Sequence, residues 1–210
     1  MAGQFGAPLG AVEAAAFLGL VHDVGKLDPG FQAYLLRCER EPTWKGHGPD
    51  HKAAGSQLAR QTVHLAAMAI QGHHGGLESP SRFVAWLAAA GPAADKARED
   101  ALERFPDLAP VIAPVLPGHV EADPLAAEFF VRLLFSALVD ADFLDTERHF
   151  HPGHSEQRHG DTPLAELWRR FERSHATFPV PQDGDIVNQV RAEVYDACLG
   201  AATARPGIFR

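Results

Sequence analysis

The alternation of apolar and polar residues that marks a surface β-strand is almost absent from this chain of 210 residues. Apolar residues instead recur at helical spacing, in runs that open with a capping residue and a proline, at Asp28–Pro29, Ser79–Pro80 and Asp123–Pro124. The Asp or Ser side chain accepts a hydrogen bond from the first helical turn, and proline is favoured at the first helical position. We therefore expect an all-α fold, a compact bundle of about eight helices.

The same signals predict where the helices begin and end. Helical runs are expected over residues 10–22, 29–39, 50–61, 63–75, 80–90, 93–104, 124–145, 163–175 and 185–203. Two loops rich in Gly and Pro are expected at 40–49 and, with several histidines, at 149–160. No internal repeat is visible.

Composition limits the classes of protein that fit. Apolar residues make up 46% of the chain, which is typical of a globular protein. No run approaches the ~20 apolar residues of a membrane span, and no basic segment precedes an apolar core at the N-terminus. Cys38 and Cys198 form no CxxC motif, which predicts reduced thiols and a cytoplasmic location. The net charge of −8 argues against a broad basic surface for nucleic acid.

Several histidines and one aspartate gather at helix ends. His22 and Asp23 end the first run, His51 lies in the first turn of another, and His73 and His74 close a third. Adjacent residues on a helix point about 100° apart, so His22 and Asp23 can both reach one ion in a crevice beside the helix.

Two aspartates, Asp140 and Asp142, lie inside the longest apolar run. A buried carboxylate without a partner is costly, so a cation is expected nearby. Arg132 is one candidate partner and a metal ion is the other. Imidazole and carboxylate ligands together suit Mn, Fe, Co, Ni or Zn, so the ordered set predicts a transition-metal site in a cleft.

The segments HDVGK, FQAYL, DHKAAG, GHHGGL and SALVDADFLDTE occur in this order. Together they resemble the HD nuclease domain of the CRISPR type I nuclease-helicase, CRISPR-associated protein three, a branch of the HD phosphohydrolase superfamily. The resemblance implies an all-α HD-domain bundle with one or two divalent metal ions in a central cleft. Mn, Fe, Co and Ni are the expected ions, with Zn and Mg as alternatives. It also implies hydrolysis of single-stranded DNA, with a helicase module and a CRISPR surveillance complex as partners and no role for a membrane.

The resemblance assigns a role to each candidate ligand. His22 resembles a ligand of a first metal ion, and Asp23 resembles the carboxylate that both ions share. The three remaining histidines, His51, His73 and His74, resemble the ligands of the second ion. These assignments define two metal positions on either side of Asp23.

The last ligand of the family is an aspartate between an alanine and an aromatic residue. Asp142, in Ala141–Asp142–Phe143, fits that context better than Asp140, which lies about 200° away around the helix. Lys26 resembles the lysine of the family's HDxGK motif, close enough to contact a phosphate or support the metal ligands. Asp23 and Lys26 are therefore the expected catalytic residues.

Two features depart from the family pattern. The family carries another histidine ligand upstream of the HD pair, but no histidine precedes His22 here. Residues 2–6 resemble the end of the helix that would carry it, so either the true start lies upstream or the first metal position is short of one ligand. Residues 186–210 resemble a linker to a helicase, and no GxxxxGK[ST] motif occurs in the chain. We therefore expect residues 1–210 to be a single nuclease domain without ATP-driven unwinding.

Two other functions stay open from the sequence. An HD nucleotide phosphohydrolase would share the HD pair, although GHHGGL and DADFLDTE favour the nuclease. A degenerate HD scaffold without catalysis would explain the missing upstream histidine.

Other polar residues could have either a functional role or an ordinary structural one. Cations near the expected cleft could follow a DNA backbone, and Trp44 could stack on a base, but surface charge and ordinary packing explain them equally well. These cations are Arg37, Arg40, Lys45 and Lys52. A loose histidine group is more typical of a polar loop than of another metal site, and it comprises His149, His151, His154 and His159.

Overall fold

Every regular element in the described part of the chain is a helix, which confirms the predicted all-α fold. The computed structural model describes residues 1–109, 117–157, 162–180 and 182–205. Its α-helices are α1 (Ala2–Gly6), α2 (Val12–Val21), α3 (Pro29–Arg40), α4 (Lys52–Val63), α5 (Met68–Gly72), α6 (Pro80–Ala88), α7 (Gly91–Arg104), α8 (Gly118–Ala122), α9 (Pro124–Phe150), α10 (Pro152–Gln157), α11 (Leu164–His175) and α12 (Ile186–Ala201). Short 3₁₀ turns connect some of them: η1 (Ala7–Leu9), η2 (Val24–Leu27), η3 (His64–Ala67) and η4 (Pro106–Leu108).

Helices α3, α6 and α9 begin where the capping pairs predicted. The Asp28 carboxylate accepts a hydrogen bond from the Phe31 amide at 3.1 Å. Asp123 accepts one from the Leu125 amide at 2.9 Å, and Ser79 caps α6 in the same way. Each cap satisfies an amide that the helix itself leaves without a partner, so local chemistry alone fixes these three starts.

Other predicted boundaries are wrong. The run at 63–75 is divided, because His64 adopts a positive φ of 50° and η3 precedes α5. Gly91–Pro92 opens α7 instead of only closing α6. Pro152 starts α10, so residues 152–157 are helical and the predicted loop at 149–160 is incorrect there. Residues 158–160 of that loop, including His159, lie outside the described residues.

The central helix α2 is buried through close contacts at glycines. A β-carbon on Gly6 of α1 would lie 2.6 Å from the β-carbon of Ala15, and one on Gly55 of α4 would overlap the carbonyl oxygen of Val21. Such contacts require glycine, because any side chain would push the helices apart. The close approach brings the end of α2 beside the start of α4, where His51 lies.

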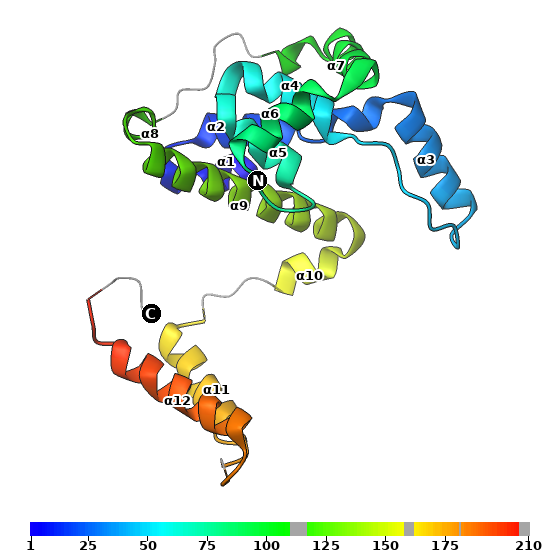
Figure 1. Cartoon of the computed structure of the whole chain (residues 1–210). Helices are drawn as coiled ribbons and strands as arrows, with labels where there is room; N and C mark the ends of the chain where they lie inside the picture. The colour runs from blue at the N-terminus through cyan, green and yellow to red at the C-terminus, as the bar shows by residue number, and fades with distance from the viewer. Residues whose placement is uncertain (110–116, 158–161, 181, 206–210) are drawn as a thin grey trace. The chain divides into compact units, whose positions relative to one another are not determined.

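Helix α9 packs against α1, α2 and α5 and runs along them (Figure 1). Leu134 and Leu138 of α9 are fully buried in the core with Leu18, Ile70 and Phe83. This packing positions Asp142, one turn beyond Leu138, beside the end of α2. Helix α3 and the loop at 41–51 extend away from these helices before the chain returns to α4 (Figure 1).

Contacts divide the chain into two compact units, residues 1–158 and 159–210. In the second unit, α11 and α12 meet through stacked rings, with His175 and Tyr195 3.9 Å apart between ring centroids. No described residue of this unit is buried. The expectation that residues 1–210 form a single nuclease domain stays a prediction.

None of the helices in the described ranges is long and apolar enough to cross a membrane.

Candidate metal centre

His22 is held in one orientation by the end of its own helix. It follows α2 directly, and its Nδ1 lies 2.8 Å from the carbonyl oxygen of Gly19. A carbonyl can only accept a hydrogen bond, so Nδ1 carries the proton and donates it. The lone pair of His22 is therefore on Nε2, which points into the site.

His73 is fixed in the same way at the end of α5. Its Nδ1 donates to the carbonyl of Ile70 at 2.6 Å, and its side chain is fully buried. Burial lowers the pKa of His73 to about 4, although the Ile70 carbonyl opposes this change. The imidazole is neutral at physiological pH, and its Nε2 also offers a lone pair to the site.

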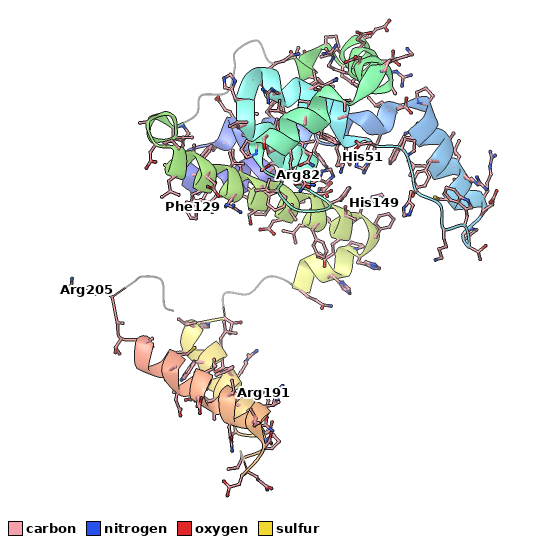
Figure 2. The ribbon with its side chains drawn as sticks, in the orientation of Figure 1. His51, Arg82, Phe129, His149, Arg191 and Arg205 are labelled. Carbon is pink, nitrogen blue, oxygen red and sulfur yellow. The ribbon has the colours of Figure 1, made fainter. Side chains whose placement is uncertain are left out.

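His51 reaches the site because the start of α4 lies against the turn after Asp23. The Asp50 carboxylate accepts hydrogen bonds from the amides of Lys52 at 2.7 Å and Ala53 at 3.3 Å, and so holds the first turn of α4. A β-carbon on Gly25 would overlap the His51 carbonyl, so these two backbones touch. Figure 2 shows His51 where the chain returns from the loop at 41–51.

Asp23 lies between the imidazoles and presents a different oxygen to each side. Its Oδ2 is 3.4 Å from His22 Nε2 and 2.6 Å from Lys26 Nζ. Its Oδ1 is 3.5 Å from His51 Nε2 and 4.0 Å from His73 Nε2. The carboxylate thus faces two sets of nitrogen atoms, as a shared ligand must.

The charge of Asp23 is supported by its neighbours. Burial alone raises the pKa of this carboxyl, but the His22 imidazole and the hydrogen bond from Lys26 lower it below its ordinary value of 3.8. Burial also lowers the pKa of His51, against the opposing effect of Asp23. An ionised Asp23 beside neutral His51 and His73 has the protonation state that metal ligands require.

Five of the six candidate ligands, all except Asp23, form two overlapping groups of ligand atoms among the described residues. Within each group they all lie within 4.8 Å of one another. His73 belongs to both groups, whereas the family resemblance placed it with the second ion only. One group comprises His51, His73 and His74, and the other comprises His22, His73 and Asp142.

Asp142 and Asp140 are placed differently by α9. Asp142 Oδ1 is 3.6 Å from His22 Nε2, and its side chain is partly buried. Asp140 is exposed and belongs to neither group of ligand atoms among the described residues. The geometry therefore favours Asp142 as the carboxylate beside His22.

Several buried polar atoms of the site lack a partner that a cation would supply. Among the described residues, four of these buried atoms have no hydrogen-bond partner: His22 Nε2, Asp23 Oδ1, His51 Nε2 and His73 Nε2. Buried polar atoms are normally paired, and leaving them unpaired costs about 1–3 kcal/mol each. The lone pairs of His22 Nε2 and His73 Nε2 and the Asp23 oxygen are all electron donors, so a cation between them satisfies them together.

A cleft gives access to this centre from the side of α1. It has a volume of about 320 Å³ and is lined by His22 and Asp142 with residues of α1, α2 and α9. Sequence reasoning predicted a crevice but did not identify the residues of α1 that line it. The carbonyls of Gly19 and Ile70 were also missed, because every residue type offers the same carbonyl group.

The remaining candidates lie elsewhere. Trp44 packs under the Arg37 guanidinium, 4.4 Å from its ring centre, and beside Tyr34. His151 and His154 stack on each other at 5.2 Å but belong to no group of candidate ligands among the described residues. A larger apolar groove of about 650 Å³ between α11 and α12 contains none of the ligands.

Comparison with known proteins identifies a family for most of the chain. The family model described as Cas3, HD domain, matches residues 6–142, a range that includes all six candidate ligands and ends at Asp142. No curated protein matches the chain, and no solved structure matches it either. With well over half of its length matched, the chain belongs to the family of Cas3 HD domains, in the HD phosphohydrolase superfamily.

Proposed function

We propose that this chain is a metal-dependent nuclease that hydrolyses phosphodiester bonds of single-stranded DNA in CRISPR type I interference. The observation that carries the proposal is the convergence of four unpartnered buried donor atoms from the ends of α2 and α5 and the start of α4. The family is one of metal-dependent HD hydrolases and implies a helicase context, so we propose a helicase module as the partner of this chain.

The residues have distinct roles in this proposal. His22 and Asp142 would hold an ion on one side of Asp23, and His51 and His74 would hold an ion on the other, with His73 in reach of both. Bound divalent ions lower the pKa of a coordinated water toward neutrality and stabilise charge on the phosphoryl oxygens. Mn, Fe, Co or Ni is the ion proposed from the family resemblance, and each accepts this mixture of nitrogen and oxygen donors.

The chain's own charges help to place an anionic strand. The Lys26 ammonium lies beside the ligands and can contact a phosphate. Arg40 lies at the end of α3, where a cation can follow a backbone. Trp44 is engaged by Arg37 and Tyr34, so packing explains it without a base.

Cleavage of circular single-stranded DNA tests the proposal. The parent chain with Mn²⁺ should linearise the circle, and Asp23→Ala should abolish this, because removing the shared carboxylate removes a ligand from both sides. Hydrolysis of free nucleotides without cleavage of the circle would support the nucleotide phosphohydrolase instead. A purified chain that binds no transition metal would support the non-catalytic scaffold.

A further inference from the structure

Lys26 occupies one of the two oxygens that make Asp23 a shared ligand. Its Nζ lies 2.6 Å from Asp23 Oδ2, the shortest contact that Asp23 makes in the described site. The geometry is built into the turn η2, where the Lys26 amide donates to the Asp23 carbonyl at 2.9 Å and Gln32 donates to the Lys26 carbonyl at 2.6 Å. The ammonium is therefore aimed at Asp23 by the fold.

The two oxygens of Asp23 are unequal as a result. Oδ1 faces His51 and His73 and has no hydrogen-bond partner. Oδ2 faces His22 and already accepts a charge-assisted hydrogen bond. A cation that approaches through Oδ1 meets a free lone pair, whereas one that approaches through Oδ2 must displace a positive charge.

We propose that Lys26 is an internal cation that competes with metal for Asp23 Oδ2, so that the side of His22 and Asp142 binds its ion more weakly than the side of His51. This inference rests on the proposed metal-dependent function and adds an order of loading to it. The Lys26 side chain is 38% exposed and its four-carbon stem is flexible, so the ammonium can move into the solvent when an ion arrives. A released ammonium is then free for a phosphate of the substrate.

Lys26 is a positioning residue in this arrangement. Removing its charge should strengthen metal binding on the His22 side, whereas removing a merely structural residue would weaken it. Lys26→Met keeps the length of the side chain without its charge, and Lys26→Arg keeps the charge. Lys45→Met is the matched control, because Lys45 is an exposed cation on the loop before α4. Asp142→Asn identifies the event on the His22 side, because it removes a ligand of that side only.

Calorimetric titration with Mn²⁺ alone, without DNA, tests the proposal. We expect two binding events in the parent, and the weaker one should be lost in Asp142→Asn. Lys26→Met should tighten the weaker event by at least about tenfold and change the stronger one by less than about threefold, since a repelling unit charge is removed at contact distance. Lys26→Arg and Lys45→Met should stay within about threefold of the parent.

Other results would overturn the inference in ways that can be told apart. Unchanged or weaker Mn²⁺ binding in Lys26→Met, or two events of equal affinity in the parent, would refute the competition while leaving the nuclease in place. A parent that binds no Mn²⁺ would refute the proposed function as well.

A second measurement uses the parent chain only. Acetylation of lysine amines, followed by mass spectrometry, reports how free each ammonium is. Saturating Mn²⁺ should increase the labelling rate of Lys26 at least about threefold relative to Lys45, because the ion pair with Asp23 opens. An unchanged or reduced rate at Lys26 would contradict the proposal even if the variants failed to fold.

Discussion

The backbone of Gly25 lies directly against the carbonyl group of His51, so closely that a β-carbon on residue 25 would overlap the carbonyl oxygen. This contact joins the turn after Asp23 to the start of α4. It sets the 3.5 Å separation between His51 Nε2 and Asp23 Oδ1. Glycine at position 25 is therefore a requirement of the metal centre and not only of the local turn.

Gly25→Ala should damage metal binding and stability together. The added methyl group must push α4 away, which typically costs about 1–3 kcal/mol in a packed site. We expect a lower melting temperature and loss of the ion on the His51 side, measured by thermal denaturation and by metal analysis of the purified chain. Gly75→Ala is the control, because nothing lies within 4 Å of a β-carbon there. Equal metal content in the two variants would show that the contact does not position His51.

Asp142→Asn and Asp140→Asn form a matched pair on one helix. The first replaces an oxygen that lies 3.6 Å from His22 Nε2, and the second changes an exposed side chain outside both ligand groups. We expect Asp142→Asn to slow cleavage of single-stranded DNA by at least about tenfold, because the carboxylate that would hold the ion on the His22 side loses its charge. Asp140→Asn should cleave at the parent rate. The reverse pattern would assign the carboxylate to Asp140.

The metal-free chain should lose stability as the pH falls from about 6.5 to about 4. The pKa of His73 is lowered to about 4 in the folded chain and is near 6.5 when unfolded. The unfolded state therefore binds a proton in this range that the folded state does not, so stability increases with pH. Since one pKa unit corresponds to about 1.4 kcal/mol, His73 contributes up to about 3 kcal/mol to this change.

Urea denaturation in a chelator at a series of pH values measures this dependence. His73→Gln removes the titrating group, so its stability should change less across the same range. His51 also has a lowered pKa and should leave a smaller dependence in that variant. A parent chain whose stability is constant from pH 7 to about pH 4 would contradict the burial of a neutral His73.

Phe31 should be important for holding His51. Its ring is 6% exposed, 5.1 Å from the His51 ring centroid and 5.5 Å from that of Tyr34. Phe31→Ala should reduce the free energy of unfolding by about 3–5 kcal/mol, as large truncations in a core do. Leu36→Ala, on the exposed side of α3, should change it by less than about 0.5 kcal/mol. Urea denaturation of both variants checks the difference, and equal losses would argue against a special role for the ring.

Much of the fold could be predicted because local chemistry decides it. The caps at Asp28 and Asp123 act within one turn, so the sequence is sufficient to locate them. The division of the run at 63–75 was not predictable, since a positive φ is uncommon even for histidine and the residue type alone does not locate it at His64. The start of α10 at Pro152 was missed because proline is common both in loops and at the first helical position.

In the candidate site, the types of ligand were predictable from the sequence but their arrangement was not. The types and order of His22, Asp23 and His51 pointed to metal ligands before any geometry was known. Their distances, and the inclusion of His73 in both groups, depend on how α5 and α9 pack on α2. That packing depends on many small side chains together and cannot be read from a motif.

The position of Asp142 on α9 has a consequence for the newly made chain. Five of the six candidate ligands lie within the first 74 residues, and the sixth follows only with α9. At a synthesis rate of ~5–20 residues per second, α9 follows α5 by roughly 3–14 seconds. During that interval a growing chain holds the histidines of one side but lacks the carboxylate of the other. The complete centre therefore forms only after α9 has been made, which is well after its histidines.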